Sequence, residues 1–460
     1  MKLLDTIAAI STPYGKGGVA LIRISGEDAC RVGEAIFAPA SGKRLGELAH
    51  GQMVYGEIRS PDGVILDDGM AVCFHAPHSF TGEDTVELTC HGGVRITAKV
   101  LQAALCAGAR AAEAGEFTRR AYIGGKMRLS EAEALGLLLD AKSDSQLLLA
   151  RNGMKGGLAD RTEELYTSLR TVLSSVWAAI DFPEEDLAEL SRVQMREQVA
   201  TALSGIRELA ATYGTGRAIT EGVATVICGR TNAGKSSVYN RIVGYNAAIV
   251  TEVEGTTRDV LRETATLGKT LLRLCDTAGL RQTEDRVERI GIERTREEMK
   301  QAGLILAVFD ASCPLTEEDL ALTEEIGQMG VPAIALLNKS DRQESADMTA
   351  VRERFPHTVA VSAADGQGFD RLSVEIDRLF IDGSLNVQTD AVVTGARQYA
   401  ALMLAAEALE ATLTDLDAEL PLDLCCVGLE TALTSLGQVD GRELGEEIVS
   451  EIFSRFCVGK

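Results

Sequence analysis

The sequence lacks the features that mark membrane-spanning, disulfide-rich and zinc-binding proteins. It has no apolar run of about 18 residues, the length that a membrane-spanning helix needs. Its ten cysteines form no CxxC pair and have no His-rich neighbours, which argues against a zinc site and a disulfide framework. The opening MKLLDTIAAIST is interrupted by Asp5, so we expect no signal peptide. Reduced thiols in a cytoplasmic protein fit this pattern best.

Proline and positive charge are also scarce. The chain has 9 prolines and neither a repeat nor a low-complexity linker, so its domains should meet through helices and short loops. Lys and Arg total 46 against 68 Asp and Glu, a net charge of −22. Such a surface repels nucleic acid, and a nucleic-acid substrate would need a local basic patch or a partner that supplies one. A length of 460 residues predicts about three domains.

Hydrophobic patterning divides the chain into four segments. Residues 1–118 mix β-rich runs with turns and predict a small α+β domain. Residues 119–215 and 381–460 repeat apolar residues at helical spacing. Residues 216–380 alternate apolar runs with helical stretches, which predicts a doubly wound parallel sheet. The predicted strands are 19–26, 69–77, 84–93, 223–228, 271–276, 304–310, 333–338 and 358–363, and single helices are expected near 93–107 and 191–213.

The segment GRTNAGKSS, residues 229–237, fits a phosphate loop. It follows a predicted strand and opens a predicted helix, and its backbone N–H groups would surround phosphates. Lys235 would reach the β and γ oxygens, and the Ser236 hydroxyl would bind Mg²⁺. For this segment alone, a chance glycine-rich turn is the alternative.

Four further fragments follow in the order expected of a GTP site. Thr257 in GTTRD could bind Mg²⁺, and Asp276 and Gly279 in DTAG would face the metal and the γ-phosphate. Asp341 in NKSD can accept two hydrogen bonds from guanine that adenine cannot supply, and SAADG, residues 362–366, would lend backbone donors to the guanine oxygen. The candidate nucleotide-binding residues are Asn232, Ala233, Gly234, Lys235, Ser236, Ser237, Thr257, Asp276, Thr277, Ala278, Gly279, Asn338, Lys339, Asp341, Ser362 and Ala363.

Hydrolysis also needs a group that orients water and a group that stabilises charge. Leu280 stands where Ras-type enzymes have a glutamine that orients the water. Four nearby carboxylates could replace it or could be solvated charges on a switch helix: Glu284, Asp285, Glu288 and Glu293. A monovalent cation could stabilise charge if Asn232 and the loop 246–257 supplied its oxygen ligands.

The chain resembles the MnmE (TrmE) family of tRNA-modification GTPases, of the TrmE-Era-EngA-YihA-Septin-like superfamily, from residue 6 to residue 460. The segments that carry the resemblance are GRTNAGKSS, AAIVTEVEGTTRD, DTAGLRQTEDRVERIGIERT, NKSD, TIAAISTPYGKGGVALIRISG, HSFTGEDTVELTCHGG, GEFTRRAYIGGKMRLSEAEAL and FCVGK. The resemblance implies a multidomain α/β fold. It would have a folate-binding-like α+β N-terminal domain, a central helical domain formed from two chain segments, and an inserted Ras-like P-loop G domain.

The same resemblance implies a mechanism for the G domain. K⁺ would bind Asn232 and the carbonyl groups of Thr251, Val253 and Thr256, with Thr251 and Thr256 also counted as nucleotide-binding. Dimerisation of the G domains would order the switches and activate hydrolysis of GTP with Mg²⁺. Glu288 would orient the water through a second, bridging water and is the candidate catalytic residue.

For the N-terminal domain, the resemblance implies a homodimer that binds a tetrahydrofolate derivative, 5,10-methylene or 5-formyl, through Arg23, Glu87, Lys126 and Lys460. The partners would be tRNA and the FAD protein MnmG (GidA), in a heterotetramer or larger complex. Together they would add an aminomethyl or carboxymethylaminomethyl group at carbon 5 of the wobble uridine. Cys457 would lie near the folate, and a catalytic role for it is open.

Three alternatives remain at this point. The basic cluster Arg119, Arg120, Lys126 and Arg128 could be an ordinary solvated face. The whole chain could be a ribosome-assembly switch that binds RNA, although such proteins carry a basic RNA-binding region and the flanks here are acidic. It could also be a folate enzyme that needs neither tRNA nor a partner protein and carries a regulatory G domain.

Overall fold

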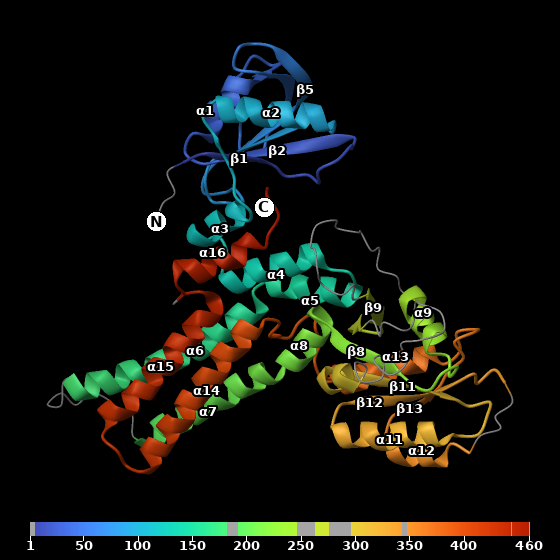
Figure 1. The fold of residues 1–460 in the computed structure, drawn as a ribbon. Coiled ribbons are helices and arrows are strands. Elements are labelled where there is room, and N and C mark those ends of the chain that lie inside the picture. The colour runs from blue at the N-terminus through green and yellow to red at the C-terminus, as the bar shows by residue number, and fades with distance from the viewer. Residues whose placement is uncertain are drawn as a thin grey trace. The chain divides into compact units, whose positions relative to one another are not determined.

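The computed structural model describes residues 5–181, 192–245, 263–275, 296–342, 347–442 and 444–459. Contacts divide the chain into two compact units (Figure 1). Unit 1 comprises Met1–Gly136 and Leu433–Lys460, and unit 2 comprises Leu137–Ala432. The chain passes between the units within α4 (Leu129–Asp140) and again within α15 (Leu422–Asp440).

Unit 1 contains a mostly antiparallel sheet. Its described strands lie in the order β3-β4-β5-β6-β2-β1-β7, and only the β1–β7 pair is parallel. The strands are β1 (Ile7–Ile10), β2 (Val19–Ser25), β3 (Phe37–Pro39), β4 (Met53–Arg59), β5 (Ile65–Phe74), β6 (Thr85–His91) and β7 (Arg110–Ala111). The helices are α1 (Ala29–Ile36), the short 3₁₀ helix η1 (Leu45–Glu47), α2 (Val94–Cys106), α3 (Glu116–Ile123) and α16 (Glu446–Ser454).

The apolar core of unit 1 lies between this sheet and the helices α1 and α2. Ala20, Ile22 and Ile24 alternate along β2 and are buried in that core. Because successive side chains on a strand point to opposite faces, Arg23 lies on the other face of the sheet. That face is therefore where charged groups of the strands can meet.

Unit 2 contains a second sheet, in the order β13-β12-β11-β8-β10-β9, in which only the β10–β9 pair is antiparallel. The strands are β8 (Val223–Cys228), β9 (Glu263–Leu267), β10 (Thr270–Leu274), β11 (Leu304–Asp310), β12 (Ala333–Asn338) and β13 (Thr358–Ala360). Along β11, Leu306 and Val308 belong to one buried cluster while Ala307 and Phe309 belong to another. Both faces are thus covered, as expected of a parallel sheet.

The remaining helices of unit 2 flank this sheet or form a separate helical layer. They are α5 (Asp144–Met154), α6 (Gly157–Asp181), α7 (Arg192–Ala211), α8 (Tyr213–Thr220), α9 (Lys235–Tyr245), α11 (Glu317–Met329), α12 (Thr349–Arg354), α13 (Phe369–Phe380) and α14 (Ala396–Asp417). Helix α7 precedes the sheet in the chain and α14 follows it, yet they run side by side (Figure 1). Arg196 of α7 binds Asp417 of α14 at 2.6 Å.

The predicted strands and helices are confirmed where they fall on described residues. The apolar run 223–228 is β8, and the helices expected near 93–107 and 191–213 are α2 and α7. The structure adds strands that the sequence did not predict: β1, β3, β4, β7 and β9. Among the described residues, no helix combines the length and apolar character needed to cross a membrane.

Candidate functional site

The phosphate loop lies between β8 and the start of α9, and its two motif glycines fit only as glycines. A Cβ added to Gly229 would lie 2.3 Å from the Val308 carbonyl oxygen, and one added to Gly234 would lie 2.1 Å from Asn338 Nδ2. Their φ angles are +146° and +100°, values that residues with a Cβ rarely adopt. The loop can therefore pass close to Val308 of β11 and to Asn338 at the end of β12.

Lys235 lies across this loop from the first turn of α9. Its Nζ donates to the carbonyl oxygens of Gly229 at 2.8 Å and Arg230 at 2.9 Å. Burial lowers the pKa of the Lys235 ammonium. A phosphate placed over the loop would supply the opposite charge that favours the ammonium form.

Two serines open α9 beside this lysine. Ser236 and Ser237 are exposed, and the first N–H groups of a helix have no partners within it. The exposed N-terminal turn therefore offers both backbone N–H groups and hydroxyls to an anion or to its counterion. The Ser236 hydroxyl suits Mg²⁺, which prefers oxygen ligands.

Asn338, at the end of β12, connects the phosphate loop to the loop after β13. Its Nδ2 donates to the Ala233 carbonyl oxygen at 2.9 Å, and its Oδ1 accepts from the Ala363 N–H at 3.1 Å. Asn338 is 2% exposed, so these bonds are shielded from water. The Ala363 N–H, one of the donors predicted for guanine, is therefore engaged by Asn338 here.

Lys339 and Asp310 hold the neighbouring part of the site. Lys339 Nζ donates to the Asn232 carbonyl oxygen at 3.1 Å and to Asp310 Oδ2 at 2.6 Å. Burial of Asp310 raises its pKa, but hydrogen bonds from Lys339 and Ser312 outweigh this and lower the pKa below its ordinary value. Asp310 therefore stays ionised and fixes Lys339, while Asp341 is exposed and remains accessible to a base.

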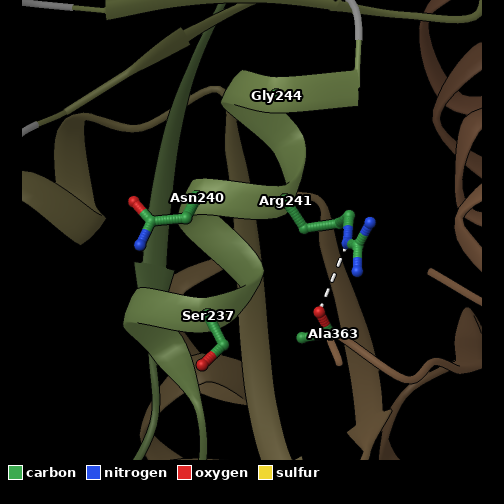
Figure 2. Close-up of a pocket in the computed structure, with 5 residues that line it drawn as sticks. All are labelled: Ser237, Asn240, Arg241, Gly244 and Ala363. Carbon is green, nitrogen blue, oxygen red and sulfur yellow. Dashed lines mark hydrogen bonds between the residues drawn. The ribbon is translucent and has the colours of Figure 1, made fainter. Parts of the chain in front are cut away.

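A cavity of about 490 Å³ lies between α9 and the loop after β13. Figure 2 shows its lining residues, which come from α9 and from the loop after β13: Ser237, Asn240, Arg241, Gly244 and Ala363. Arg241 donates to the carbonyl oxygens of Ala363 at 3.2 Å and Ala364 at 2.6 Å. Asn240 and Arg241 were not predicted, although they lie three and four residues after Ser237 and so on its side of the helix.

Several predicted residues lie outside the described residues. They are Thr251, Val253, Thr256, Thr257, Asp276, Thr277, Ala278, Gly279, Glu288 and Lys460, together with the other carboxylates considered for water orientation. The described part of the site is therefore the phosphate loop, the end of β12, the loop after β13 and the cavity.

In unit 1, the structure brings the predicted Arg23 and Glu87 together. They are direct cross-strand partners on β2 and β6, and Arg23 binds Glu87 Oε1 at 2.8 Å. The Arg23 guanidinium also lies 5.5 Å from the Phe80 ring centre and 5.7 Å from that of Phe117. This pairs a carboxylate with a flat cation between aromatic rings, a suitable surface for a planar heterocycle.

Lys126 and residues 457–459 lie in the same unit. Lys126 Nζ donates to the Pro77 carbonyl oxygen at 2.9 Å. The Ser11 hydroxyl donates to the Gly459 carbonyl oxygen at 3.0 Å. Ser11 follows β1 two residues after Ala9, and Ala9 is the cross-strand partner of Arg23. Cys457 is exposed.

The interpretation of Arg120 as part of a solvated basic face is wrong. Its side chain is 1% exposed and binds Glu116 at 3.0 Å, Asp5 at 2.8 Å and Glu83 at 3.2 Å. These partners come from three separate segments, so Arg120 is a buried connection within unit 1. Arg128 pairs with Glu131 at 3.1 Å on the first turn of α4.

Comparisons with known proteins cover the whole chain. Family models described as "MnmE helical domain" and "GTP-binding protein TrmE N-terminus" match residues 129–457 and 6–126. The chain is 40% identical over 460 residues to the tRNA modification GTPase MnmE of Ligilactobacillus salivarius, covering 99% of this chain and 98% of the relative. It is 41% identical over 458 residues to that of Symbiobacterium thermophilum, covering 99% of each.

A solved structure of Era from Aquifex aeolicus, bound to GDP and AlF4⁻, is 20% identical with a TM-score of 0.27. It covers 40% of this chain and 66% of its own. That likeness is too low to support a conclusion about fold or to favour a ribosome-assembly switch.

Proposed function

The chain belongs to the MnmE family of tRNA modification GTPases, and from this premise we propose that it hydrolyses GTP in modifying the wobble uridine of certain tRNAs. The observation that supports this is the connection made by Asn338 between the phosphate loop and the loop after β13. A helix N-terminus behind a glycine-rich loop favours phosphate, and the exposed carboxylate of Asp341 favours guanine. Ser237 of the helix start and Ala363 of the loop after β13 line one cavity.

Two cations complete the proposed hydrolytic site. Ser236 and Thr257 would hold Mg²⁺. Asn232, with the carbonyl groups of Thr251, Val253 and Thr256, would hold K⁺. Asn232 is exposed and has a φ angle of 66°. Its side-chain amide makes no hydrogen bond within the described part of the chain, so its carbonyl oxygen is available to a cation. When bound, such cations neutralise charge on the phosphates.

The proposed roles of the protein side chains follow from this arrangement. Lys235 would hold the β and γ oxygens. Glu288 would orient water through a bridging water, which leaves Leu280 no part in the reaction.

We also propose the finer assignments for the rest of the chain. Residues 1–118 would form the folate-binding and dimerisation domain, 119–215 and 381–460 the helical domain, and 216–380 an inserted G domain. Arg23, Glu87, Lys126 and Lys460 would bind a tetrahydrofolate derivative that supplies carbon. The paired Arg23 and Glu87 support this, because a carboxylate suits the amino and N–H donors of a pterin. MnmG and tRNA would be the partners, with the protein acting in the cytoplasm.

The test exchanges the base that the site accepts. Asp341→Asn replaces an acceptor with an amide that can donate to a xanthine carbonyl. We expect kcat/KM for GTP to fall by about 100-fold, since each hydrogen bond to a charged group contributes about 1.5–3 kcal/mol, and hydrolysis of XTP to rise. The control is Asp370→Asn, on the first turn of α13, which should hydrolyse GTP like the parent protein.

The same assay should be run in KCl and in NaCl at equal ionic strength. We expect stimulation by K⁺ in the parent protein and loss of that stimulation in Asn232→Ala. Unchanged base preference in Asp341→Asn would reject the proposed guanine site, and equal rates in the two salts would reject the proposed cation site.

A further inference from the structure

Three side chains with metal-binding atoms meet in unit 1, whereas the candidate nucleotide site belongs to unit 2. Cys30 lies on α1, His75 directly follows β5, and Asp84 directly precedes β6. Each offers one ligand atom, and the three atoms lie within 4.8 Å of one another. The sequence argument against a zinc site did not detect them, because they are distant in sequence and meet through the pairing of β5 with β6.

The hydrogen bond of the His75 ring suits metal binding. Its Nε2 lies 3.1 Å from the Leu48 carbonyl oxygen. A carbonyl can only accept, so Nε2 carries the hydrogen and Nδ1 keeps the lone pair that a metal ion needs. Histidine ligands in metal sites commonly donate their other ring N–H to a backbone carbonyl in this way, which fixes the ring and its tautomer.

The other two side chains are also held in place. Asp84 Oδ1 accepts from the Ala76 N–H at 2.8 Å, which orients the carboxylate and leaves Oδ2 available. Cys30 is held by α1, whose side chains Ala29, Val32 and Ile36 are buried in the core of unit 1. All three candidate ligands are half-buried, so an ion could enter from solvent and still be partly shielded from it.

Further histidines surround this cluster. The chain has five, and the rings of His50 and His75 lie 6.5 Å apart, while those of His50 and His78 lie 5.9 Å apart. His50 Nδ1 accepts from the His75 backbone N–H at 3.2 Å. The second histidine therefore supports the segment that carries the candidate ligand.

We propose that Cys30, His75 and Asp84 form a Zn²⁺ site with one open coordination position. A thiolate, a neutral imidazole and a carboxylate are the ligands that Zn²⁺ takes, and three protein ligands plus water is a common arrangement for it. The thiolate disfavours Mg²⁺ and Ca²⁺, which prefer oxygen. The two anionic ligands balance the charge of the ion.

The first experiment measures metal binding by the untagged, full-length, reduced protein. After treatment with a chelator, the protein is titrated with Zn²⁺ against a chromophoric competitor, and with Co²⁺ to detect sulfur-to-metal charge transfer. We expect one Zn²⁺ per chain with a Kd of about 1 μM or tighter. Cys30→Ser should lose the charge-transfer band and bind Zn²⁺ at least about 100-fold more weakly. Substituting residues that only hydrogen-bond to metal ligands already lowers metal affinity about 10–100-fold.

Matched controls share the residue types but lie outside the cluster. His78→Ala removes an exposed neighbouring histidine, and Cys106→Ser removes an exposed cysteine of the same unit. Both should bind Zn²⁺ like the parent protein. Equal affinities of Cys30→Ser and the parent protein, or a parent Kd weaker than about 100 μM, would overturn the proposal.

A second measurement needs no variant and so does not depend on whether Cys30→Ser folds. The parent protein is alkylated with and without Zn²⁺, and labelling of each cysteine is followed by mass spectrometry. Zn²⁺ should slow labelling of Cys30 at least about tenfold relative to Cys106 in the same sample, because a coordinated sulfur is shielded. Equal slowing of the two cysteines, or of neither, would reject the site.

Discussion

The two sheets of the molecule place their polar groups differently. In unit 2, β8, β11 and β12 are buried on both faces, and the polar groups of the candidate site follow the strands in loops. In unit 1, one face of the sheet is apolar, and the other carries charged side chains within the strands, among them Arg23 and Glu87. A ligand can therefore reach the sheet of unit 2 at the ends of its strands, and the sheet of unit 1 on one of its faces.

This difference follows from how each sheet is covered. A parallel sheet needs helices on both sides, so only the carboxyl ends of its strands are open to a ligand. An antiparallel sheet needs cover on one side only. Residues at strand ends lie close in sequence to a loop motif that can be recognised. Residues that share a sheet face are distant in sequence, and the register of strand pairing brings them together.

The buried ion cluster of unit 1 gives the largest expected effect. Arg120→Ala removes a cation that is 1% exposed and leaves Glu116 and Glu83 without one of their partners. We expect the free energy of unfolding to fall by about 3–5 kcal/mol, the usual cost of breaking a buried pair. Urea denaturation followed by circular dichroism measures it. The exposed pair Arg31–Asp28 is the control, and Arg31→Ala should leave the free energy of unfolding almost unchanged, because exposed ion pairs contribute little. Equal costs would contradict the structural role of Arg120.

The phosphate loop gives the second effect. Gly234→Ala places a Cβ against Asn338, so the loop must shift and the bonds of Asn338 to Ala233 and Ala363 must change. Backbone strain of about 1–3 kcal/mol and lost hydrogen bonds of about 0.5–1.5 kcal/mol each predict at least about 100-fold weaker GTP binding by calorimetry. Gly214→Ala, which meets no atom within 4 Å, should bind normally. Normal GTP binding by Gly234→Ala would show that the loop does not depend on this close approach.

Arg241 gives a smaller effect, because it fixes from α9 the loop after β13, which we propose to contact guanine. Arg241→Ala removes its hydrogen bonds to the carbonyl groups of Ala363 and Ala364. Half-buried bonds of this kind contribute about 0.5–1.5 kcal/mol, so GTP should bind about 3–10-fold more weakly. Arg378→Ala, which removes an exposed arginine of α13 paired with Glu375, serves as the control. An equal effect of the two substitutions would mean that Arg241 does not organise the cavity.

The smallest effect concerns pH. Burial raises the pKa of Glu116, but hydrogen bonds from Arg110, the Glu113 N–H and Arg120 outweigh it, so the pKa lies below its ordinary value of 4.5. A lowered native pKa contributes stability above the unfolded pKa, and this is lost as pH falls through the native value. In Glu116→Gln, thermal stability should therefore fall less steeply between about pH 5 and pH 3. The exposed Glu164→Gln should behave like the parent protein. An unchanged acid profile in Glu116→Gln would contradict this assignment.

The sequence predicted the parts of the fold whose signals are local. β8 was predicted to the residue, because a strand buried on both faces reads as an unbroken apolar run. β9, with the sequence ETATL, was not predicted. Its position depends on antiparallel pairing with β10 and on the hydrogen bond from Tyr239 to Glu263 at 2.8 Å, neither of which is local.

The candidate sites show the same limit. The phosphate loop and the NKSD segment were recognisable as contiguous patterns, but the bonds of Asn338 that connect them depend on the order of the strands. Arg23 and Glu87 were named only by resemblance, and their direct pairing is a matter of register. The burial of Arg120 depends on Asp5 and Glu83, residues 115 and 37 positions away.

The pairing of residues near the two ends of the chain has a consequence for synthesis. Ser11 bonds to a carbonyl 448 residues later, and Ala114 bridges to Val458. While the chain grows on the ribosome, the N-terminal strands emerge first, but unit 1 cannot make these contacts until residues 458 and 459 have been translated. Unit 1 therefore lacks these contacts while residues 137–432 of unit 2 are being synthesised.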